Sequence, residues 1–143
     1  MRLISVLGVL ILASACAPEP TTPSDTSLAG VWTSNAHMYS FSGFRLVIGV
    51  QKAEGLFGGQ WTGKADTGAG CSIPTPCNVS GNLLGRNTIS RVEIEILGAG
   101  KFDGALVEAN RLRGLFAVGS TYDTITFDRI QGAAAAQISE GDR

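Results

Sequence analysis

The sequence is poor in the side chains that most often carry out chemistry. It contains a single histidine, His37, and none of the short motifs of serine hydrolases, zinc proteases, P-loop proteins or dinucleotide-binding proteins. One histidine cannot build a His-rich zinc site, and it leaves no spare histidine for a Ser–His pair. We interpret His37, near Tyr39, as a solvated side chain. The sequence therefore predicts a protein that is not an enzyme and that needs no metal or cofactor.

The chain also lacks a large excess of charge of either sign. The chain has 11 basic and 12 acidic side chains, a formal net charge of −1, and no basic patch, so nucleic acid is not expected as a partner. Glu93 and Glu95 lie two residues apart and are predicted to form part of a solvated outer face. Asp123 and Asp128 fall on opposite faces of one predicted strand and form no carboxylate pair.

No apolar run is long enough for a permanent transmembrane helix. The N-terminal run ends by Ala17, short of the roughly 20 residues that cross a bilayer. Arg2 precedes an apolar core over Leu3–Leu12, and the small residues Ala13-Ser14-Ala15 follow. A basic start, an apolar core and a small-residue exit are typical of a secretory signal peptide, here predicted over residues 1–15.

The end of this signal resembles the lipobox of bacterial lipoproteins, in which small residues precede a cysteine that becomes the lipid-modified N-terminus. The resemblance covers Leu12 to Cys16, although Ala13 occupies the position where the family usually has leucine. Ala13-Ser14-Ala15 can equally be an ordinary A-x-A cleavage site. Cys71 and Cys77 can pair with each other, which leaves Cys16 as an odd thiol in an oxidising compartment and favours its lipidation.

The rest of the chain is predicted to divide into a tether, one domain and a tail. Residues 16–27 contain the lipidated cysteine and a segment rich in Pro, Ser and Thr, with no apolar face to bury, which would reach roughly 30 Å if extended. Residues 28–130 have the size of a single domain. Residues 131–143 are expected to form a flexible or weakly helical tail.

Apolar residues of the domain recur with a period of two. Phe44, Leu46, Ile48 and Val50 share one face, and Val92, Ile94 and Ile96 do likewise in ISRVEIEIL. Strict alternation predicts half-buried antiparallel strands. We expect eight strands, near residues 28–34, 42–51, 55–64, 78–84, 88–97, 101–107, 110–118 and 121–130.

Glycine recurs two residues after an apolar residue inside these strands, at Gly59, Gly81, Gly104 and Gly114. Glycine within a strand usually marks a bulge, a bend or a close approach of two backbones. Its repetition on successive strands predicts an all-β fold in which an antiparallel up-and-down sheet of eight strands is curled into a closed barrel. A β-sandwich with local bulges is the alternative.

Gly30-x-Trp32 lies on the first predicted strand, and Arg129 lies on the last, on the same face as Ile125 and Phe127. In these three residues the chain resembles the calycins, the lipocalin and avidin-type barrels. The resemblance implies that Trp32 closes one end of the barrel and that Arg129 packs across its ring. The polar set of avidin-type biotin sites is absent, so biotin binding is not expected.

Further expectations follow from a barrel of this kind. Trp61, Phe44 and Phe116 are tentative walls of a site for a small apolar ligand, with core packing as the alternative role of Trp61. The predicted function is a non-catalytic binding module, anchored by lipid in the bacterial cell envelope, in the outer membrane if the host has two membranes. The alternatives are a barrel that binds an envelope protein or inhibits a protease, and a filled barrel with no ligand.

The paired cysteines are expected to form a small disulfide loop. Cys71 and Cys77 enclose Ser-Ile-Pro-Thr-Pro, between the third and fourth predicted strands. Two thiols alone are half a metal site, and an exported protein would oxidise them. We expect the loop to stiffen this connection, which can overhang an open end of the barrel.

Overall fold

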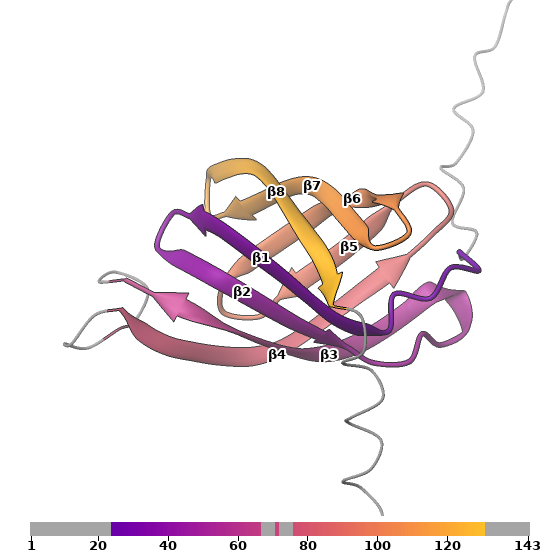
Figure 1. Ribbon diagram of the computed structural model, residues 1–143, viewed down its shortest axis with the longest axis horizontal. Helices are drawn as coiled ribbons and strands as arrows, with labels where there is room; N and C mark the ends of the chain where they lie inside the picture. Colours follow the sequence, from indigo (N-terminus) through magenta and orange to yellow (C-terminus); the bar gives the residue numbers. More distant parts are fainter. Residues whose placement is uncertain (1–23, 67–70, 72–75, 131–143) are drawn as a thin grey trace, which may run out of the picture.

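A computed structural model describes residues 24–66, 71 and 76–130 of the chain. These residues form a closed barrel in which each strand pairs antiparallel with its neighbour in sequence and β8 pairs with β1 (Figure 1). The strands are β1 (Gly30–Met38), β2 (Phe41–Ile48), β3 (Leu56–Ala65), β4 (Cys77–Asn87), β5 (Val92–Ile96), β6 (Gly100–Glu108), β7 (Arg111–Val118) and β8 (Thr121–Ile130). A 3-10 turn, η1 (Ala53–Gly55), lies between β2 and β3.

The predicted eight-stranded up-and-down barrel is confirmed, and the sandwich alternative is wrong because the sheet closes on itself. β1 extends beyond its predicted end to Met38, and β5 begins only at Val92. Val50, predicted to share the inward face of β2, is 83% exposed because β2 ends at Ile48. The alternation is therefore right within β2 and fails where the strand stops.

The core is the barrel interior. Side chains at alternate strand positions point inward and pack into one cluster, whereas those between them face solvent. The largest fully buried side chains are Trp32, Phe44, Phe102, Phe116, Phe127, Leu28, Leu46, Leu83, Ile94, Ile96, Leu112 and Ile125. An eight-stranded barrel is just wide enough to be filled by such side chains.

Glycines let strands and rings approach where a side chain would clash. A Cβ on Gly104 would lie 2.3 Å from the carbonyl oxygen of Arg113, directly across the β6–β7 ladder from Gly114. A Cβ on Gly81 would lie 2.8 Å from Nε1 of Trp61, its partner on β3. The glycine pattern thus marks close approaches within the curled sheet, which is the reason that the sequence suggested for it.

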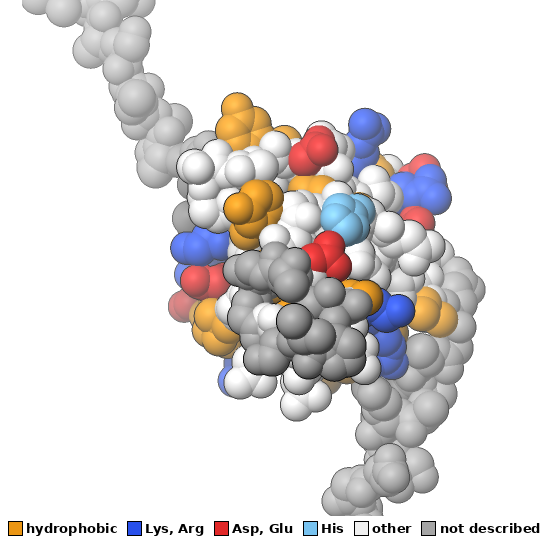
Figure 2. Space-filling model, turned by 90° about the vertical axis from the view of Figure 1, so that its left-hand side faces the viewer, with side chains coloured by type: hydrophobic (Ala, Val, Ile, Leu, Met, Phe, Trp, Pro, Cys, Tyr) orange, Lys and Arg blue, Asp and Glu red, His pale blue; other side chains and the backbone are white. Residues whose placement is uncertain are grey.

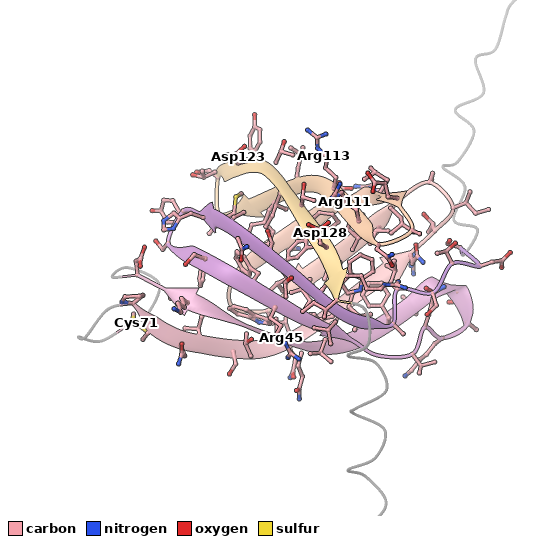
Figure 3. All side chains as sticks on the ribbon, in the orientation of Figure 1. Arg45, Cys71, Arg111, Arg113, Asp123 and Asp128 are labelled. Carbon is pink, nitrogen blue, oxygen red and sulfur yellow. A yellow bond between two sulfur atoms is a disulfide. The ribbon has the colours of Figure 1, made fainter. Side chains whose placement is uncertain are left out.

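The barrel has two distinct ends. At the N-terminal end, β1 begins and β8 finishes, and residues 24–28 lie against the barrel. At the opposite end, here called the mouth, lie the β1–β2 and β7–β8 hairpins and Cys71 (Figures 1 and 3).

Candidate functional site

The N-terminal end of the barrel is closed by the Trp32 ring, over which the Arg129 guanidinium lies. Arg129 Cζ lies 4.5 Å from the centre of the Trp32 ring, and Trp32 is fully buried. The Trp32 indole N–H donates to the carbonyl of Leu28 at 2.8 Å, and Arg129 donates to the carbonyl of Ser27 at 2.6 Å. Burial lowers the pKa of the Arg129 guanidinium from its ordinary value. Gly30, at φ 136°, sits beside the Arg129 stem.

Residues 24–28 form a strap across this end, although residues up to 27 were predicted to belong to the flexible tether. The amide of Asn87, only 3% exposed, donates to the Thr26 carbonyl at 2.6 Å and to Oε1 of Gln51 at 2.9 Å. Gln51 in turn donates to the Ser24 carbonyl at 2.8 Å. These hydrogen bonds satisfy the buried Asn87 amide and hold residues 24–28 against the barrel. No local sequence pattern connects positions so far apart.

The three residues of the predicted ligand wall lie inside the barrel, where Phe44 packs against both of the others. The Phe44 ring centre is 5.2 Å from that of Phe116 and 6.1 Å from that of Trp61. Phe41 packs edge-on against Trp61 at 6.1 Å. The Trp61 indole N–H donates to the Leu97 carbonyl at 2.9 Å. Core packing therefore accounts for all three rings, and a ligand would have to displace them.

A hollow lies on the outer wall of the barrel, across β3 to β8. This outer groove has a volume of about 690 Å³. Exposed apolar side chains contribute to its lining: Leu56, Leu84, Leu115 and Tyr122. The groove was not predicted from the sequence, because alternation assigns the outward side chains of a strand to solvent and does not show where they gather.

Paired charges line the same groove. Arg91 donates to both carboxylate oxygens of Asp103, through Nε and Nη2, and Lys101 lies 3.6 Å from Glu95. The hydrogen bond from Arg91 lowers the pKa of the Asp103 carboxyl. Glu93 contacts Arg91 at 3.2 Å. Glu93 and Glu95 thus sit on the outward face, as their parity predicted, and each is tied to a cation.

A second ion-paired cluster covers the outer face of β7 and β8. Arg111 Nε donates to Asp128 Oδ1 at 2.7 Å, and the same guanidinium lies 3.3 Å from Glu108 (Figure 3). The bond to Asp128 raises the pKa of Arg111. Asp123 lies at the other end of β8 and forms no pair with Asp128, as predicted (Figure 3).

The mouth carries the predicted disulfide. Cys71 and Cys77 are bonded, with their Cα atoms 5.9 Å apart. His37 Nε2 lies 3.6 Å from Asp66 Oδ2, and the side chains are 63% and 45% exposed. Figure 2 views the molecule from this end and shows the histidine beside an acidic group, with hydrophobic side chains nearby. A small hollow of about 120 Å³, here called the seam pocket, lies between β1 and the β7–β8 hairpin.

The described residues contain no group of three or more His, Cys, Asp or Glu side chains placed to hold a metal ion. Over the same residues, no helix has the length and apolar character needed to span a membrane. Cys16 lies outside them. Comparison with protein-family models, with curated proteins and with solved structures gave no match for this chain.

Proposed function

We propose that the protein is a lipid-anchored, non-catalytic binding module of the bacterial cell envelope, which docks a partner protein on the outer wall of its barrel. The observation that carries this proposal is the filled interior. The rings of Phe44, Trp61 and Phe116 occupy the volume in which a calycin-like barrel would hold a ligand. Removing one such ring from a packed core costs about 3–5 kcal/mol, so a ligand inside the barrel would have to repay a comparable loss.

The outer groove has the make-up of a protein-binding surface. Leu84 is 56% exposed, Leu115 50% and Tyr122 70%, and Arg91 and Lys101 beside them are ion-paired. Aromatic and apolar anchors surrounded by polar groups are characteristic of protein interfaces. Because the groove lining has equal numbers of basic and acidic side chains, a partner would be held by these apolar anchors rather than by net charge.

A second candidate function is supported by the size of the same groove. Its volume of about 690 Å³ falls within the range of small-molecule sites. The occupant would then be a small apolar ligand, as the sequence suggested, bound outside the barrel instead of inside it.

Photo-crosslinking in the native envelope tests the proposal. A photoreactive amino acid at Leu84 or at Leu115 is expected to capture a discrete protein partner. Val50 is the matched control, because it is apolar, 83% exposed and not part of the groove lining. Equal capture at Val50, or none at the two groove positions, would contradict the proposal. A co-purifying small molecule seen by native mass spectrometry, without protein capture, would support the second candidate.

The anchor is tested separately. The mature protein is expected to begin at Cys16 and to carry acyl groups, and Cys16→Ser is expected to release it from the membrane fraction. An intact mass without lipid, or an N-terminus at Ala17 or later, would show that the anchor is absent.

A further inference from the structure

The ladder that closes the barrel, between β1 and β8, is short. Their ladder has three residue pairs, from Val31–Ile130 to Thr33–Asp128. On its other side, β8 pairs with β7 from Asp128 to Thr121. Within the described residues, β8 from Thr121 to Phe127 therefore has a strand partner on one side alone. In Figure 1 the two ribbons meet near the end of β8 and lie apart over the rest of it.

The register shows which backbone groups of β8 face the unpaired stretch between β1 and β8, here called the seam. The Arg129 N–H donates to the Asn110 carbonyl at 2.8 Å, so Arg129 directs its backbone groups towards β7. Backbone direction alternates along an antiparallel strand. The N–H and C=O groups of Tyr122, Thr124 and Thr126 consequently point towards the seam, beyond the last pair with β1.

On each strand that borders the seam, one backbone N–H is hydrogen-bonded to a side-chain oxygen close by in the sequence. The Thr124 N–H donates to its own neighbour, Asp123 Oδ1, at 2.6 Å. On β1, the Ala36 N–H donates to Ser34 Oγ at 3.3 Å. Side-chain oxygens of this kind take the place of a missing strand, and a charged residue on a free edge discourages indiscriminate pairing. The contact between Thr124 and Asp123 is the one that an incoming strand would replace.

The seam pocket lies where this free edge reaches the mouth. It is lined on one side by His37, Met38 and Tyr39, and on the other by Phe116, Val118 and residues 121–123. Met38 and Phe116 are buried, so the base of the pocket is apolar. Its volume of about 120 Å³ accommodates one small apolar side chain. Tyr122 lines both this pocket and the outer groove, which makes the two surfaces continuous.

We propose that the free edge of β8 binds an extended segment of the partner protein by β-strand addition. The proposal rests on the function proposed above and specifies the chemistry of the partner. Its backbone pairs with Tyr122 and Thr124, and one small apolar side chain fills the seam pocket. A carbonyl of the partner accepts the Thr124 N–H, which frees the Asp123 carboxylate to bind a lysine or arginine two residues or fewer away. Main-chain pairing supplies affinity in this mode of recognition, and the pocket and charge supply specificity.

A displayed library of random dodecapeptides, selected against the full-length protein, tests this inference. We expect selected peptides to combine small apolar residues with a basic residue. N-methylation of alternate backbone amides, which leaves side chains unchanged, should weaken binding by about tenfold or more, the effect of losing two hydrogen bonds. Thr124→Pro should weaken binding equally, and Ile125→Pro, whose N–H faces β7, should instead unfold the protein.

Two further variants keep the test decisive if Thr124→Pro fails to fold. Asp123→Asn retains the oxygen that caps the Thr124 N–H but removes the charge, and it should weaken peptide binding and reduce its salt dependence. Val50→Glu, which lies outside both the outer groove and the seam pocket, should leave peptide binding unchanged. Peptides that tolerate N-methylation would overturn the strand-addition proposal and leave the proposed function standing. Failure to select any peptide, or a dimer of this protein that Asp123→Asn abolishes, would overturn it as well.

Discussion

The contact between Trp32 and Arg129 gives the sharpest test of how the barrel end is closed. Trp32 is fully buried, and its indole N–H is hydrogen-bonded to Leu28. Trp32→Ala removes that ring and is expected to lower the free energy of unfolding by about 3–5 kcal/mol. Arg129→Ala removes the guanidinium that lies 4.5 Å from the ring centre.

The coupling energy between Trp32→Ala and Arg129→Ala can be estimated from this geometry. A cation over an aromatic face is worth about 0.5–1 kcal/mol when exposed and about 2 kcal/mol when desolvated. Arg129 is half-buried, and its Nε is buried without a hydrogen-bond partner among the described residues. Desolvation thus offsets part of the gain. We expect the double variant to be more stable than the sum of the single effects by about 1–2 kcal/mol.

Urea unfolding of a chain beginning at Ser24, followed by circular dichroism, measures the cycle. The same cycle with Trp61→Ala in place of Trp32→Ala is the control, because the Trp61 ring packs on Phe41 and Phe44. The control pair is expected to be additive within about 0.5 kcal/mol. Additivity of the Trp32 pair to the same precision would refute the claim that the cation and the ring stabilise each other.

Three further predictions concern the rest of the barrel. Gly104→Ala should destabilise the protein by about 1–3 kcal/mol through overpacking. Gly58→Ala should be tolerated, because the added Cβ would lie 3.8 Å from the nearest heavy atom. Equal urea midpoints for the two variants would contradict this. Replacing Cys71 and Cys77 by serine should leave the barrel folded but lower its stability by about 2 kcal/mol, as expected for a short loop, and an unchanged midpoint would show that the bond contributes nothing. Arg91 lowers the pKa of the Asp103 carboxyl in the folded protein. The stability that this pair contributes is therefore present above about pH 4 and is lost as the pH falls through the lowered pKa. Asp103→Asn should flatten the acid limb of the curve of unfolding free energy against pH, and an unchanged limb would refute the assignment.

The sequence by itself determined the class of fold and several of its contacts. Period-two alternation is a local property, because successive side chains of a strand point to opposite sides of the sheet. It therefore identified the barrel strands, and the parity of Arg129 with Phe127 placed that cation on the inward face. The predicted export signal, with two cysteines and no further metal ligands nearby, likewise made the Cys71–Cys77 bond predictable. Alternation says nothing about where pairing stops, which is why Val50 was misplaced.

The tertiary structure alone decided how the barrel is filled, strapped and closed. Whether Phe44, Trp61 and Phe116 line a cavity or fill it depends on how strands distant in sequence aim their rings at a common centre. The hydrogen bond from Asn87 to Thr26 joins residues 61 positions apart, so no local pattern could reveal it. The free edge of β8 depends on where the β1–β8 ladder ends, and this is set by the twist and curvature of the whole sheet.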